Sequence, residues 1–151
     1  MNDNIEKILA EDGFYVSTTV GTSMSPMLRN RKDRVVICPV NGRLKKYDLP
    51  LYRRPDGKYV LHRIIGVRDG YYIIRGDNTY RKEKVPDDWI IGYVTEFYRN
   101  EKHFFATQKR YRAYARVWNW IYPLRVCGVK CRQFLSKVKH AVLKPFRHKK
   151  Q

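Results

Sequence analysis

The sequence has no run of 18 or more apolar residues, so we expect no transmembrane helix. The chain opens on polar residues with no apolar segment behind them, and no secretory signal peptide is therefore expected. Cysteine is scarce and odd in number, with three residues, which does not suit a disulfide-linked secreted protein. These absences together predict a protein of the reducing cytoplasm.

Groups of metal ligands are also missing from the sequence. Cys127 and Cys131 are four residues apart, but no nearby histidine or second cysteine pair completes a zinc site. We therefore expect idle or buried thiols, no metal and no cofactor.

Acidic residues are almost absent from the C-terminal third. Residues 99–151 contain 15 lysines and arginines and one acidic residue, whereas residues 1–98 contain 17 basic and 13 acidic residues. The net charge of +18 therefore belongs mainly to the tail and concerns the tail's partners rather than catalysis. We predict a catalytic domain over residues 1–98 and a basic helical tail over residues 99–151.

The pattern before residue 99 predicts a mainly β fold. Ile5, Ile8 and Leu9 have helical spacing, and Asp12-Gly13 ends this short helix. Short segments rich in β-branched and aromatic residues follow, separated by turn signals, and predict strands over residues 14–20, 34–38, 49–53, 59–67, 71–75 and 89–97. Such strands form a small coiled antiparallel sheet or a partly open barrel.

A candidate nucleophile lies in residues 21–26, Gly-Thr-Ser-Met-Ser-Pro. A small hydroxyl residue between a glycine and a proline sits on a sharply turning backbone, which presents it at a strand end. A serine needs a base from elsewhere in the chain, and His62, in the middle of an apolar run, is the candidate. Ser23 alone would also cap a turn, and His62 alone would also suit a core; the pair indicates a serine hydrolase.

Three segments resemble, in order, the conserved boxes of type I signal peptidases and the self-cleaving repressor peptidases, which form one serine-peptidase clan. They are residues 23–26 (Ser-Met-Ser-Pro), 59–65 (Tyr-Val-Leu-His-Arg-Ile-Ile) and 74–78 (Ile-Arg-Gly-Asp-Asn). A histidine in the second box is similar to the archaeal and endoplasmic-reticulum type, whereas bacterial members use lysine. The resemblance spans roughly residues 13–98. It implies a signal-peptidase-like core with Ser23 as nucleophile and His62 as base.

The sequence departs from this pattern at two places. The family's acidic residue falls six positions after the aspartate of the third box, which is Glu83 here, so Asp77 and Glu83 both remain candidates for orienting His62. Signal peptidases usually have a serine two positions before the nucleophile, and this chain has Gly21 at that position. The oxyanion hole would then consist of the Ser23 backbone N–H and the Thr22 hydroxyl, and losing one donor can cost on the order of a hundredfold in rate.

The resemblance also implies where a substrate lies. In the family, the strand before the serine pairs with the extended substrate peptide, so Val20 in that strand is a candidate substrate-binding residue. Shallow apolar pockets in the family hold small substrate side chains. Met24 is a candidate for such a pocket, although a methionine equally fills gaps in a core.

The tail has a helical pattern of apolar and basic residues. Apolar and aromatic residues recur every three or four positions between the basic ones: Tyr111, Tyr114, Ala115, Val117, Trp118, Ile121 and Tyr122. Basic amphipathic helices are typical of membrane-surface anchors, and that is the partner we expect. An acidic partner or nucleic acid, and packing of the helix on the sheet, are the alternatives.

These observations lead to the hypothesis of a cytoplasmic, membrane-associated serine endopeptidase that cleaves a peptide or precursor protein, with leader or signal peptides as one substrate class. A catalytically weak or inactive peptide-binding protein on the same scaffold is the alternative, because of the departures at positions 21 and 83. A self-cleaving repressor is disfavoured, since no DNA-reading helical domain precedes residue 14. Lys58, four residues before His62, is the lysine that could imitate a lysine base.

Overall fold

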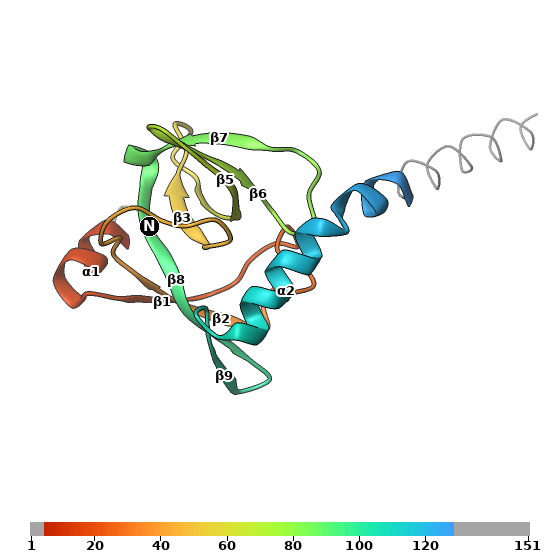
Figure 1. Cartoon of the computed structure of the whole chain (residues 1–151). Coiled ribbons are helices and arrows are strands. Elements are labelled where there is room, and N and C mark those ends of the chain that lie inside the picture. Colours follow the sequence, from red (N-terminus) through yellow and green to blue (C-terminus); the bar gives the residue numbers. More distant parts are fainter. Residues whose placement is uncertain (1–4, 129–151) are drawn as a thin grey trace, which may run out of the picture. The chain divides into compact units, whose positions relative to one another are not determined.

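The computed structural model describes residues 5–128. Within them the first compact unit of the chain ends at Asn119, and the fold and site below belong to that unit. The unit is mainly β, as the sequence predicted, with a curled antiparallel half-barrel and a short N-terminal helix α1, Ile5–Asp12 (Figure 1). The tail residues 129–151 lie outside the described residues, so the helices predicted there stay a prediction.

One antiparallel sheet has the order β1-β2-β8-β3-β4, with β9 paired to β8. The sheet consists of β1 Tyr15–Thr18, β2 Arg34–Cys38, β3 Pro50–Arg53, β4 Tyr59–Leu61, β8 Ile90–Arg99 and β9 Lys102–Phe105. The long strand β8 connects the two ends of this sheet, because the first residues of β8 pair with β3 and its later residues pair with β2 and β9 (Figure 1).

The second sheet has the order β5-β6-β7, with β5 at Arg63–Arg68, β6 at Tyr71–Arg75 and β7 at Glu83–Pro86. The predicted strand over residues 59–67 is divided at His62, because β4 pairs with β3 while β5 pairs with β6. His62 therefore lies at the point where the chain leaves one sheet and enters the other.

The end of the first unit differs from the boundary expected at residue 98. That position falls inside β8, and the sheet continues through β9. The helix α2, Lys109–Trp120, follows and buries Tyr111 and Ala115. The first part of the predicted tail therefore packs on the sheet, the arrangement that was one of the alternatives for it.

Two hydrophobic clusters meet at His62. The larger one packs α1, the residues after Ser23 and strands of the first sheet around Leu28, Ile37 and Val94, and Leu61 packs against it. The smaller one contains Tyr52, Ile64, Tyr72, Ile74, Val85 and Leu44. Leu61 packs against the larger cluster, and Val60 and Ile64 pack in the smaller one, so the chain on both sides of His62 is anchored in the core.

Within the described residues, no helix is both long enough and apolar enough to span a bilayer.

Candidate active site

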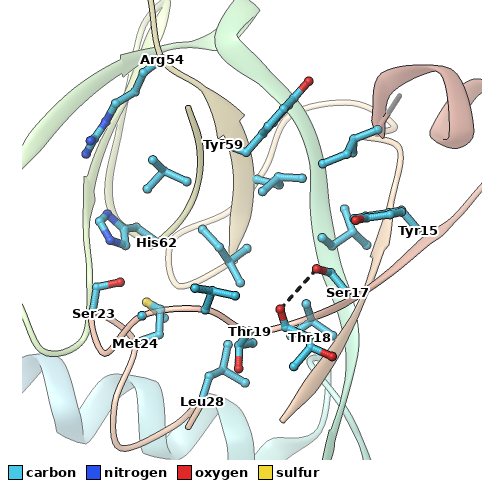
Figure 2. A pocket seen from close by; sticks show the side chains of 18 residues that line it. Tyr15, Ser17, Thr18, Thr19, Ser23, Met24, Leu28, Arg54, Tyr59 and His62 are labelled. Atoms are coloured by element: carbon cyan, nitrogen blue, oxygen red, sulfur yellow. Dashed lines mark hydrogen bonds between the residues drawn. The ribbon is translucent and has the colours of Figure 1, made fainter. Parts of the chain in front are cut away.

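Ser23 and His62 line one cavity of about 410 Å³. Figure 2 shows their side chains next to each other on one wall, with Tyr15, Ser17 and Thr18 of the β1 edge on the opposite side. Most of the remaining lining is apolar, including Ile5, Leu28, Val35, Ile37, Leu51, Tyr59 and Leu61. The structure thus brings together two residues that are far apart in the sequence and places an apolar cavity beside them.

The loop bearing Ser23 is fastened at both ends. Gly21 has a φ of 94°, which favours glycine, and its N–H donates to Asn30 Oδ1 at 2.9 Å. The backbone N–H of Asn78 donates to the Ser23 carbonyl at 2.7 Å. The third box therefore holds the serine loop directly, which is a structural role for its asparagine.

Gly76 of the same box permits the close approach of the serine loop and the histidine. A Cβ atom at position 76 would lie 2.7 Å from the Ser23 carbonyl oxygen and 3.0 Å from His62 Nε2. Backbone and a fixed ring cannot yield to such contacts, so this corner requires glycine. The same distances show that the Nε2 side of the ring faces the serine loop.

No hydrogen bond joins the Ser23 hydroxyl to His62 among residues 5–128, although the two side chains share the cavity wall. Such bonds are often long or misaligned in unliganded enzymes and tighten when a substrate is bound. Ser23 is only half-buried and lines the cavity, so a substrate can reach it.

The other ring nitrogen of His62 faces a tyrosine and a carboxylate. His62 Nδ1 lies 3.4 Å from Tyr52 Oη and 3.7 Å from Glu83 Oε1, and Tyr52 Oη donates to Glu83 Oε2 at 3.2 Å. Because the phenol has one proton and gives it to Glu83, it accepts at its oxygen from a protonated Nδ1. This assigns the proton to Nδ1 and leaves Nε2 unprotonated as a base.

Glu83 reaches this position through β7, which the sequence analysis did not predict. Its register pairs Glu83 with Ile74 on β6, and Ile74 pairs with Ile64 on β5, two residues after His62. Arg54 fixes the carboxylate with its Nε at 3.0 Å and its Nη2 at 2.6 Å from Oε2. The carboxylate is thus held between Arg54 and Tyr52.

Burial lowers the pKa of His62 below its ordinary value of 6.5. The negative charge of Glu83 opposes this effect, and the positive charge of Arg54 reinforces it. Burial and the charge of Glu83 raise the pKa of Tyr52, so the phenol stays protonated. A neutral imidazole at physiological pH is the form that can accept a proton.

Asp77, the other candidate orienting acid, has a different environment. Its carboxylate accepts hydrogen bonds from Arg63 Nε and Nη2, both at 2.7 Å, and both side chains are almost fully buried. Arg63 also donates to Tyr111 Oη at 2.7 Å, and Trp118 Nε1 donates to the Asp77 carbonyl at 2.9 Å. Asp77 therefore joins the sheet to α2, while Glu83 is the carboxylate beside the Nδ1 atom of His62.

The remaining predicted residues lie as follows. Val20 is exposed and Met24 is buried, and both line the cavity, so Met24 serves the core and the cavity together. Thr22 is not part of the lining, and its carbonyl accepts from the Ser25 N–H at 3.1 Å. The Ser23 N–H donates to no group among residues 5–128 and can meet an oxyanion.

The alternative lysine base lies apart from the cavity lining. Lys58 is exposed, and its ammonium group lies 3.3 Å from Asp56. Cys38 and Cys127 are free thiols, and Cys131 lies outside the described residues. Over residues 5–128 no cluster of His, Cys, Asp or Glu could hold a metal ion.

Sequence reasoning missed Tyr52 and Arg54. They lie in and just after β3, which pairs with β4 across the turn at residues 55–57, with Tyr52 opposite Val60. The predicted turn between two predicted strands was the signal that could have placed both residues near His62.

No protein-family model matches the chain, and a search of curated proteins finds no match either.

Proposed function

We propose that the protein is a serine endopeptidase with Ser23 as nucleophile and His62 as general base. One observation carries the proposal: the two ring nitrogens of His62 have opposite surroundings. Nδ1 faces Tyr52 and Glu83, and Nε2 faces the corner formed by Gly76 and the Ser23 loop, at an open cavity. A base that is oriented on one side and faces a hydroxyl-bearing loop on the other is the arrangement that serine hydrolysis requires.

The proposed reaction follows from these positions. Ser23 Oγ attacks the scissile carbonyl as its proton passes to His62 Nε2, and the Ser23 N–H stabilises the oxyanion. The resulting imidazolium donates its proton to the leaving amine, and a water molecule then hydrolyses the acyl-enzyme by the reverse proton path. Tyr52 and Glu83 stabilise the imidazolium from its Nδ1 side.

The cavity supports an extended peptide with an apolar side chain as the substrate. The strand β1 is the edge of its sheet and lines the cavity, so its free backbone groups can pair with a peptide. Leader or signal peptides, the class that the resemblance implies, have such apolar side chains and are the proposed substrates.

The test is labelling with a fluorophosphonate probe followed by peptide mass spectrometry. We expect labelling at Ser23, its loss in Ser23→Ala and a strong decrease in His62→Gln. Ser25→Ala is the matched control, because Ser25 lies two residues away and is not part of the cavity lining. Cleavage of a reactive peptide by the Ser23→Ala protein at the rate of the original protein would refute the assignment.

A peptide-binding protein without hydrolysis is the second candidate. It is favoured by the lack of a hydrogen bond between Ser23 and His62 among the described residues, and by the engagement of Glu83 with Arg54. A protein of this kind would bind extended peptides at the β1 edge and stay unlabelled by the probe.

We also propose that the basic tail contacts an anionic membrane surface. The first turn of α2 has no acidic residue, and Lys109, Arg110 and Arg116 are exposed on it. Tyr111 and Ala115 pack inside the unit, so they are not available to lipid. Sedimentation with phosphatidylserine vesicles but not with phosphatidylcholine vesicles at low salt is the expected result.

A further inference from the structure

A second cleft adjoins the candidate active site. It has a volume of about 450 Å³ and is lined by Arg54, Pro55, Arg81, Lys82, Glu83, Lys84 and Trp89. Arg54 also lines the cavity that contains Ser23 and His62. Because one side chain forms part of both walls, the two cavities are neighbours.

The second cleft is strongly basic. Arg81, Lys82 and Lys84 are exposed, and the one carboxylate in the lining, Glu83, is already paired with Arg54. Among residues 5–128 no carboxylate lies within ion-pair distance of Arg81 or Lys82. Cations gathered in a concave site concentrate their field there, so the cleft attracts an anionic group.

Arg54 retains donors for such a group. Its Nε and Nη2 atoms donate to Glu83, but Nη1 donates no hydrogen bond among the described residues. A guanidinium can bind two carboxylates from different sides because its five N–H groups point in several directions. An incoming carboxylate can therefore bind Arg54 Nη1 while Glu83 stays in place.

We propose that this basic cleft binds an Asp or Glu side chain of the substrate peptide, a few residues from the scissile bond. The inference rests on the proposed peptidase function and adds a charge requirement to its substrate. A peptide carboxylate is the favoured occupant because the cleft adjoins the cavity in which the peptide backbone would lie. An extended chain advances roughly 3.3 Å per residue, so the number of residues between the carboxylate and the scissile bond decides whether the carboxylate meets the cleft.

The experiment uses acetylated and amidated peptides that share one cleavable sequence. Glutamate replaces glutamine at one position at a time, over four residues on either side of the scissile bond. We expect one position at which glutamate raises kcat/KM roughly tenfold over glutamine, an advantage that falls as salt is added. Equal rates for every glutamate and glutamine pair would overturn the inference while leaving the peptidase intact.

Variants locate the effect. Arg81→Gln combined with Lys82→Gln should remove the preference for glutamate and leave cleavage of the glutamine peptide unchanged. Lys45→Gln combined with Lys46→Gln is the matched control. This double variant removes the same amount of charge, and both lysines are exposed and line neither cavity. An equal loss of preference in both double variants would assign the effect to overall charge and overturn the site.

A binding arm separates this inference from the proposed function. Fluorescence anisotropy of the same peptides with Ser23→Ala protein tests the cleft even where no peptide is cleaved. Tighter binding of the glutamate peptide supports the cleft, and equal binding overturns it. One further result would overturn the assignment to a side chain: an equal gain from a free terminal carboxylate on the glutamine peptide.

Discussion

Two arginine–carboxylate pairs flank His62, and they differ in burial. The pair of Arg63 and Asp77 is closed off, with side chains 2% and 3% exposed, whereas Arg54 and Glu83 are 33% and 22% exposed. Both pairs have two or more hydrogen bonds. The two pairs therefore have the same chemistry, but they differ in how far solvent and other groups can reach them.

Burial decides which pair can take part in a reaction. Asp77 is surrounded by partners from Arg63 and α2, so any new contact would leave a buried cation without its counter-ion. Glu83 can rearrange with Arg54 and Tyr52 at lower cost, because water reaches that pair. We therefore propose that Asp77 has a structural role and that Glu83 orients His62.

The largest expected effect is the loss of stability in Asp77→Asn. This change leaves the Arg63 guanidinium buried without a full negative charge, which costs about 3–5 kcal/mol of unfolding free energy. Glu83→Gln, its matched variant, should cost about 1 kcal/mol or less because the pair is partly exposed. Urea unfolding measures both. An Asp77→Asn protein of normal stability but without activity would assign the catalytic role to Asp77.

Gly76→Ala should reduce kcat/KM by roughly a hundredfold, since a misplacement of about 1 Å at a reacting centre has that effect. The new methyl group would push the Ser23 carbonyl away from His62. Gly66→Ala is the control, because the atoms nearest to its Cβ would be those of the Ile73 side chain, at an ordinary contact distance of 3.5 Å. Normal kinetics in Gly76→Ala would show that the corner is not part of the site.

The proton chain from His62 through Tyr52 to Glu83 gives a smaller effect. Tyr52→Phe and Glu83→Gln should each reduce kcat by roughly tenfold or more, as expected for loss of a group that orients a general base. Their double variant should lose little beyond either single variant, because both act through the Nδ1 atom. Additive losses in steady-state kinetics would contradict a shared path.

The smallest expected effect is on the pH profile. His62 must be unprotonated to accept the serine proton, so kcat/KM falls as the pH drops through a His62 pKa that lies below 6.5. Arg54→Gln removes a cation that lowers this pKa and should move the acidic limb to higher pH. Glu83→Gln removes an anion that raises it and should move the limb to lower pH. Shifts in the same direction would contradict the assigned contacts.

Much of the fold was predictable because alternation and turn chemistry are local. The helix that ends near Asp12 and the strands on either side of Gly70 were found in this way. The division of the predicted strand at His62 could not be predicted. A strand can change its partner sheet without any change in the alternation of its side chains. Strands β7 and β9 were also missed, because each has only four residues, the first two of them polar, which is too short for an alternating pattern to show.

The site was predictable as a pair of residues and not as a complete arrangement. Ser23 and His62 came from motif order, and the structure places them on one cavity wall. The choice between Asp77 and Glu83 depends on which strand lies beside β6, a question of tertiary structure that spacing does not answer. Tyr52 had no motif, and its place at Nδ1 depends on how β3 pairs with β4.

The position of His62 between two sheets makes it sensitive to any loosening of their junction. The strand before His62 pairs within the first sheet and the strand after it pairs within the second, so a small displacement of one sheet against the other would move the imidazole before either sheet unfolds. Heating or mild denaturant should then abolish turnover while circular dichroism still reports intact β-structure. A ligand that bridges the two sheets would protect turnover over the same range of temperature or denaturant.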